Sequence, residues 1–133
     1  MIIDTSALLA ILLREPGHEV ILDVARRADL RMSVATYVEL NVVIDRRGRV
    51  GDRERLDRVL ELLGIELVPV SLEQGRVACA AHRRYGPGSG SAARLNYGDC
   101  FSYALAETLG EPLLFVGNDF SHTDVEQAIQ DPR

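Results

Sequence analysis

Short apolar runs alternate with longer amphipathic segments along the chain. Apolar residues recur at helical spacing in segments that predict helices over residues 5–14, 18–28, 35–47, 52–63, 72–85 and 100–109. Apolar runs between these segments predict short buried strands at residues 1–3, 31–34, 65–70 and 112–116. The pattern leaves open what residues 125–130 form. Strands separated by helices indicate an α/β protein with a parallel sheet and right-handed crossovers.

Composition adds that the chain is an ordinary globular domain. Its 133 residues suffice for one compact domain with its own core, and we expect residues 1–133 to form it. The 47% apolar and 26% charged content is not that of a disordered protein. No apolar run approaches the roughly 20 residues that cross a bilayer, and the first strand is predicted to begin at Met1 without a signal peptide. We therefore expect a cytoplasmic protein with no membrane partner.

The cysteines and histidines show no spacing that predicts metal binding. Cys79 and Cys100 lie in apolar helical segments without metal-binding spacing. We expect both to be reduced core residues, with a disulfide or a reactive thiol as the alternative. The three histidines form no HExxH-type pair, so a histidine-based zinc site is unsupported.

Charge is distributed unevenly. The net charge is −5, which argues against a generally basic nucleic-acid binder, and every basic residue is an arginine. Six of the arginines fall between Arg46 and Arg58. Because the planar guanidinium group binds phosphate and carboxylate well, this cluster is predicted to hold RNA or an acidic partner. The alternative is a solvated helical face.

Four acidic residues occur where predicted strands end or helices begin. Asp4 and Asp119 each follow a buried strand, Glu39 lies early in the helix after the second strand, and Asp99 precedes the helix at 100–109. In an open parallel sheet, ligands bind beyond the carboxyl ends of the strands. Three of the acids also have a structural alternative: a helix cap at Asp4, a favourable helix-dipole contact at Asp99, and a surface ion pair at Glu39.

Together these acids predict metal-assisted phosphoryl chemistry. Four carboxylates at one sheet edge repel unless a cation lies between them, and oxygen ligands without Cys or His suit Mg²⁺ or Mn²⁺. Such ions are usually shared with substrate phosphates. An aspartyl-phosphate phosphatase would need an aspartate where Ser6 stands, and both that class and receiver domains use a lysine, which is absent. No GxGxxG dinucleotide motif follows the first strand.

The motifs around these acids resemble those of the VapC-type PIN-domain toxins of VapBC toxin–antitoxin systems. In chain order they are MIIDTSA at 1–7, REPG at 14–17, VEL at 38–40, RLNYGDCFSYA at 94–104, LFVGNDF at 114–120 and TD at 123–124. The resemblance implies a PIN-like three-layer fold whose central parallel sheet has about four to five short strands flanked by helices. It also implies a Mg²⁺-dependent endoribonuclease, usually a homodimer, that a VapB-type antitoxin inhibits.

The resemblance also assigns roles to individual residues. It implies that Asp4, Glu39, Asp99 and Asp119 are catalytic. Asp4, Asp99 and Asp119 match metal ligands, Glu39 matches the acid that reaches the metal through water, and Mn²⁺ can replace Mg²⁺. The residues that match those holding the carboxylates in place are Thr5, Ser6 and Asn118. Asp124 is a further candidate, for which a structural role is the alternative.

One departure from the family pattern concerns the loop before the third acid. Relatives often carry basic residues there, whereas residues 86–91 read Gly-Pro-Gly-Ser-Gly-Ser and form a flexible rim. Contact with RNA, or alternatively with the antitoxin, is therefore expected from the arginines Arg14, Arg46, Arg47, Arg49, Arg53 and Arg94.

The predicted function is cleavage of single-stranded regions of structured RNA, such as a tRNA or rRNA loop, by metal-activated water. Two alternatives remain. One is a catalytically weak PIN-fold binding module that acts through its antitoxin or RNA. The other is a metal-dependent nuclease that acts on DNA.

Overall fold

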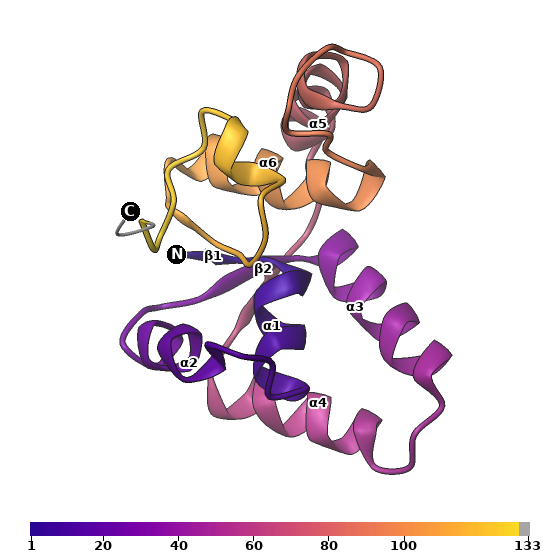
Figure 1. The fold of residues 1–133 in the computed structure, drawn as a ribbon, viewed down its shortest axis with the longest axis vertical. Helices are drawn as coiled ribbons and strands as arrows, with labels where there is room; N and C mark the ends of the chain where they lie inside the picture. Colours follow the sequence, from indigo (N-terminus) through magenta and orange to yellow (C-terminus); the bar gives the residue numbers. More distant parts are fainter. Residues whose placement is uncertain (131–133) are drawn as a thin grey trace.

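The computed structural model describes residues 1–130 and has three layers (Figure 1). The middle layer is a parallel sheet in the order β3–β2–β1–β4, formed by β1 (Ile2–Ile3), β2 (Arg31–Ser33), β3 (Glu66–Val68) and β4 (Leu113–Leu114). One face is covered by α1 (Thr5–Leu12), α2 (His18–Arg26), α3 (Val34–Arg47) and α4 (Asp52–Leu62). The other is covered by α5 (Leu72–Tyr85) and α6 (Tyr97–Leu109). The predicted α/β fold class is confirmed.

The sheet is buried on both faces. Successive strand residues point to opposite faces, so Ile2 joins the core beneath α5 and α6 while Ile3 joins the core beneath α1–α4. Leu113 and Leu114 divide between the same two cores. All four side chains are fully buried. This explains why the strands appear in the sequence as continuous apolar runs rather than as alternating ones.

The carboxyl ends of the central strands lie side by side. Ile2 is in register with Leu113, and Ile3 with Leu114. The ladder continues one residue further, since the Asp4 amide donates to the Leu114 carbonyl at 3.0 Å. Asp4, the residue just before α1, therefore lies next to the turn that follows β4.

Helix α6 packs against both α5 and the strands of the sheet. Cys100 and the whole stretch from Ser102 to Ala106 are buried. The helix begins at Tyr97, three residues earlier than expected, because the Asn96 side chain caps it by accepting the Asp99 amide hydrogen bond. That earlier start brings Asp99 into the first turn of the helix.

Several local expectations are wrong. β3, predicted to be buried, is an edge strand: of the described strands it pairs only with β2, and it leaves Leu67 exposed. Cys79 is exposed, because α5 turns Ala78 and Ala81 toward α6 instead; Cys100 is buried as expected, and both thiols are free. On α2 the apolar side chain of Val20 is exposed.

The carboxyl-terminal segment contains a short helical turn, η1 (Phe120–His122), and an isolated parallel bridge between Leu113 and Gln127. Up to residue 130, that bridge is the only regular strand pairing of the segment whose type the sequence left open. Within residues 1–130, every helix is too short or too polar to cross a lipid bilayer.

Candidate active site at the carboxyl end of the sheet

Asp4 is almost fully buried directly after β1, with 3% of its surface exposed. Its Oδ2 accepts hydrogen bonds from the Ser6 amide at 3.1 Å and the Ser6 hydroxyl at 2.7 Å. Its Oδ1 accepts one from the Ser102 hydroxyl of α6 at 2.6 Å. Asp4 thus does cap α1, but the bond from α6 also fixes the carboxylate from across the core, which capping does not require.

Glu39 is half-buried on α3 and faces the first turn of α6. The Thr5 hydroxyl donates to Glu39 Oε1 at 2.8 Å. Glu39 Oε2 lies so close to Gly98 that a β-carbon there would be 1.7 Å away. Burial raises the pKa of Glu39; the Thr5 hydrogen bond lowers it, and the charge of Asp4 raises it. Gly98 is therefore the residue that leaves room for Glu39 beside α6.

Asp99 is the buried acid at the start of α6. It forms a capping box with Asn96, in which the Asn96 amide donates to Asp99 Oδ2 at 2.9 Å and the Asp99 amide donates to Asn96 Oδ1 at 2.8 Å. Burial raises its pKa to about 7, and the charges of Asp4, Asp119 and Glu39 add to the rise against the opposing Asn96 hydrogen bond. The four acids are thus close enough to interact.

Asp119 and Asn118 lie on the exposed turn after β4. The negative charge of Asp119 is one of those that raise the pKa of Asp99. Phe120 anchors the turn, because its buried ring packs against Phe115 with the ring centroids 5.2 Å apart. The Asn118 carbonyl accepts a hydrogen bond from the Ser121 hydroxyl at 2.8 Å. The buried Phe120 ring therefore holds the turn in place, while Asn118 and Asp119 are exposed to solvent.

Hydroxyl groups connect the elements that carry the acids. Ser102 donates to Asp4 and lies 3.1 Å from the Thr36 hydroxyl of α3. The Ser6 hydroxyl accepts from the Val116 amide at 3.0 Å, which joins α1 to the turn after β4. Ser102 and Thr36 were missed in the sequence, although each lies three residues from an acid, the helical spacing that places two side chains on one face.

Asp124 is held by a different set of residues. The Tyr103 hydroxyl donates to Asp124 Oδ1 at 2.6 Å, and Arg84 pairs with Oδ2 at 3.4 Å. The Tyr103 hydrogen bond is the main cause that lowers the pKa of Asp124. These contacts tie the carboxyl-terminal segment to α5 and α6, which is the structural role considered for Asp124.

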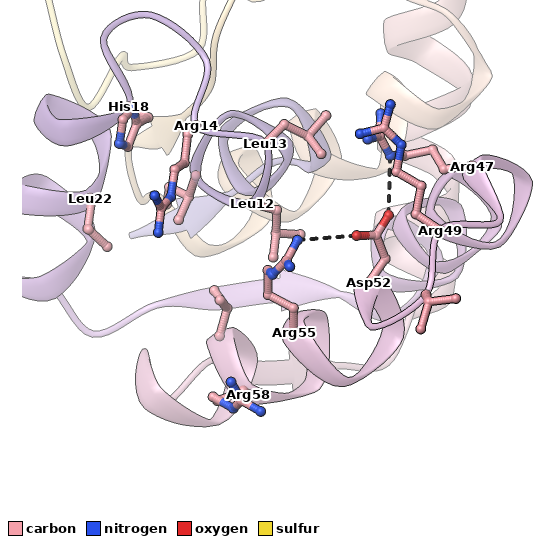
Figure 2. Close-up of a pocket in the computed structure, with 13 residues that line it drawn as sticks. Leu12, Leu13, Arg14, His18, Leu22, Arg47, Arg49, Asp52, Arg55 and Arg58 are labelled. Atoms are coloured by element: carbon pink, nitrogen blue, oxygen red, sulfur yellow. Dashed lines mark hydrogen bonds and ion pairs between the residues drawn. The ribbon is translucent and has the colours of Figure 1, made fainter.

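The six arginines predicted to contact RNA or the antitoxin do not all lie together in the structure. Arg14, Arg47 and Arg49 line a pocket between α1, α2 and α4, together with Arg55 and Arg58 (Figure 2). Three others lie outside it: Arg46 is exposed at the end of α3, Arg53 pairs with Asp45, and Arg94 is exposed before α6 with its backbone in the left-handed region at φ 51°.

The donor set of the acid cluster fits a hard divalent cation, since every acid offers oxygen atoms. Within residues 1–130, however, no three Asp, Glu, His or Cys side chains are already arranged to hold a metal ion. Ser6, Ser102 and Asn96 direct individual carboxylate oxygens into hydrogen bonds instead. Burial is the main cause that raises the pKa of Asp99, and the repulsion by the neighbouring acids that adds to it is the kind that a bound cation relieves.

Comparison with known proteins agrees with this geometry. The family model described as PIN domain matches residues 1–126. Ribonuclease VapC42 of Mycobacterium tuberculosis is 49% identical over 129 residues, which are 96% of this chain and 98% of that protein. The chain therefore belongs to the PIN-domain family, and specifically to its VapC ribonucleases.

Solved structures show the same fold. Mycobacterium tuberculosis VapC20, described as a sarcin–ricin loop cleaving toxin, superposes with a TM-score of 0.71 at 17% identity over 93% of this chain and 95% of that one. A toxin–antitoxin complex from Klebsiella pneumoniae gives 0.68 at 15% identity over 99% of this chain and 97% of that chain.

Proposed function

We propose that this chain is the toxin of a VapBC pair and hydrolyses RNA phosphodiester bonds with Mg²⁺ at the four-acid cluster. The observation that carries the proposal is the convergence of Asp4, Glu39, Asp99 and Asp119. Ser102 of α6 donates to Asp4, Thr5 of α1 donates to Glu39, and Glu39 lies against Gly98 beside Asp99. Burial raises the pKa of Asp99 to about 7, and the charges of the other three acids add to that rise. Mutual repulsion of this kind costs the fold stability, so it favours a functional reason for the cluster.

In this proposal Asp4, Asp99 and Asp119 hold the ion, Glu39 reaches it through water, and Mn²⁺ can replace Mg²⁺. An ion held there would supply Lewis acidity to a water molecule and positive charge beside the leaving oxygen.

The chain's own contribution is orientation. Thr5 holds Glu39, while Ser6 and Ser102 hold Asp4. Asn118 is proposed to add a further polar contact to the acids. Attack by water opposite the leaving 3′ oxygen gives 5′-phosphate and 3′-hydroxyl ends.

The proposed substrate is an exposed loop of a folded RNA. Bases in such RNA are readable mainly where they are unpaired, so a tRNA or rRNA loop fits. VapC20, which shares the fold, is described as cleaving the sarcin–ricin loop. The particular RNA would be identified by mapping the cleaved ends.

The test is cleavage of total cellular RNA by the purified protein, with Mg²⁺, with Mn²⁺ and with EDTA. We expect discrete fragments with either metal and none with EDTA. Fragments that persist in EDTA would contradict the metal-dependent mechanism. A folded sample that binds Mg²⁺ but cleaves nothing would favour the second candidate, a PIN-fold module that acts by binding its antitoxin or RNA.

The proposed partners are a VapB-type antitoxin and a second copy of the chain. The relative solved from Klebsiella pneumoniae is a toxin–antitoxin complex, which supports the first. For the second, Val34, Val38 and Val42 form an exposed apolar stripe along α3. The exposed Leu67 of the edge strand β3, which packs beside α3, extends this surface. Unpaired strand edges and apolar stripes are typical of surfaces that pair.

Replacing Val38 with arginine should therefore convert a dimer into a monomer, because it places a charge at the centre of the stripe. Light scattering after size-exclusion chromatography measures the change. Val20, also exposed but on α2, provides the matched control, and Val20→Arg should leave the mass unchanged. A dimer that survives Val38→Arg would place the interface elsewhere.

A further inference from the structure

Five arginines surround a pocket of about 930 Å³ on the α1–α4 side of the sheet (Figure 2). We call it the arginine pocket; its arginines are Arg14, Arg47, Arg49, Arg55 and Arg58. Asp52 is the single acid among the described residues that line it, so the pocket carries an excess of four positive charges. The whole chain, in contrast, has a net charge of −5. This is a strong local concentration of positive charge on an acidic protein.

The pocket is organised by its buried acid. Asp52 accepts from Arg47 at 3.4 Å and from Arg55 at 3.3 Å, and Figure 2 shows both guanidinium groups turned toward it. Its side chain is only 7% exposed, so these pairs are partly protected from solvent. Among residues 1–130, the side chains of Arg14, Arg49 and Arg58 form no ion pair with an acid. Three guanidinium groups therefore remain available to an anion.

The apolar residues that line the pocket belong to the core beneath it. Ile11 and Leu12 are buried members of the core under α1–α4, and Leu22 and Val59 pack against that core. Arginine stems cover apolar atoms of this kind while the charged groups stay at the surface. The charged groups at the rim of the pocket are therefore the part of it that an anion would contact.

We infer that the arginine pocket binds backbone phosphates of RNA, outside the acid cluster, on nucleotides that flank the cut. The inference rests on the proposed ribonuclease function. Phosphates that flank the cut lie beyond the proposed ion, and the loop at residues 86–91 carries no basic residue to hold them, so the pocket would supply that contact. Arginine also matches phosphate through two parallel N–H groups.

The position of the pocket fits contact with flanking nucleotides. Asp4 precedes α1 and Arg14 follows it, so the acids and the pocket lie toward opposite ends of this helix. An eight-residue helix is about 12 Å long, too far for one phosphate to reach both sites. Removing the contact should therefore raise KM for RNA and leave kcat nearly unchanged.

The experiment measures binding without cleavage. Fluorescence anisotropy follows a labelled mixed-sequence single-stranded RNA in EDTA across a range of salt concentrations, with wild type and the R14Q/R49Q/R58Q variant. We expect affinity to fall at least about tenfold at low salt and the salt slope to flatten by about 2, since each phosphate contact on a single strand contributes about 0.7.

The matched control removes three exposed arginines elsewhere, as R26Q/R76Q/R83Q. These residues lie on α2 and α5, outside the pocket, and the net charge changes equally. Thermal melting checks that both variants fold. Equal loss of affinity in both variants, or an unchanged salt slope in the pocket variant, would overturn the inference.

Two further arms separate the alternatives. Poly-L-glutamate stands in for an acidic protein segment. If the pocket variant no longer binds this polymer but binds RNA as well as wild type does, the pocket belongs to a protein partner and the inference fails. Cleavage of total RNA by wild type with Mg²⁺ tests the proposed function separately. If wild type cleaves no RNA but RNA binding depends on the pocket, the nuclease proposal fails and the inference about the pocket stands. If wild type cleaves RNA but binding does not depend on the pocket, the nuclease proposal stands and the inference fails.

Discussion

Replacing Asp99 with asparagine should lower RNA cleavage by at least about 10³-fold while making the metal-free protein more stable. The loss of cleavage follows from removing a proposed metal ligand, because a bound cation contributes several kcal/mol to stabilising the transition state. The asparagine oxygen can still accept the Asn96 amide hydrogen bond, so the capping box that starts α6 is retained. The change therefore acts on charge more than on shape.

The gain in stability follows from the raised pKa. Burial and the neighbouring acids raise the pKa of Asp99 to about 7 in the folded protein, well above its usual range. The folded state thus holds a proton that the unfolded state has released, and stability falls as the pH rises toward 7. Asparagine carries no charge, so its advantage should grow from about pH 4 to about pH 7 and then level off, reaching on the order of 1–3 kcal/mol.

Denaturant unfolding in EDTA at several pH values, together with an RNA cleavage assay, measures both effects. In Mg²⁺ the difference in stability between the variant and wild type should shrink or change sign, because only wild type gains the full free energy of metal binding. An Asp99→Asn variant that is less stable than wild type at pH 8 in EDTA would show that burial and the neighbouring acids do not disfavour the charged Asp99 as the structure indicates.

Asp124→Asn is the matched control, since it removes the same charge from an acid held by a different set of residues. Asp124 accepts from Tyr103 and pairs with Arg84, so its loss should destabilise the protein by about 1 kcal/mol and leave cleavage largely intact. The two substitutions are thus expected to move stability in opposite directions. Loss of cleavage in folded Asp124→Asn comparable to that in Asp99→Asn would move Asp124 into the active site.

Much of the fold could be predicted because the strands are buried on both faces. A continuous apolar run as short as residues 1–3 is typical of a buried strand, and the alternation of strands and helices then implies a parallel sheet. The edge strand β3 was misjudged for a related reason. Its apolar residues resemble those of a central strand, and only tertiary pairing shows that one side is open.

The acids were predictable from position, since the carboxyl ends of parallel strands meet at one edge. Their supporting contacts were not. Ser102 reaches Asp4 across 98 positions of sequence, and nothing local to Ser102 identifies that partner. The role of Asn96 could not be predicted either. Its side chain could cap a helix in many contexts, and only the structure shows that it holds Asp99.

The arginine cluster shows the opposite limit. The sequence identified its density between Arg46 and Arg58 but could not separate paired side chains from free ones. Arg53 is neutralised by Asp45 and Arg47 by Asp52, whereas Arg14, from a different part of the chain, joins the pocket. Local charge density is thus a poor guide to the surface that a partner meets.

Gly98 is the residue where a single methyl group should separate activity from stability. Gly98→Ala is expected to lower cleavage about 10²- to 10³-fold, because its β-carbon would overlap Glu39 Oε2, which is 1.7 Å from the ideal position. The clash is with the far end of a flexible side chain, so Glu39 can rotate away at little cost to the fold. Displacement of a catalytic group by about 1 Å is sufficient for a loss of this size.

Stability should not fall in parallel. Gly98 lies in the first turn of α6 without a positive φ, and alanine is favoured over glycine in helices by roughly 0.5–1 kcal/mol. The measurements are cleavage, thermal melting, and Mg²⁺ binding by calorimetry. Gly75→Ala on α5, where a β-carbon would meet nothing within 4 Å, is the control and should keep full activity. Full activity in Gly98→Ala would mean that Glu39 is not needed where the structure places it, which would remove Glu39 from the proposed mechanism while leaving the three aspartates.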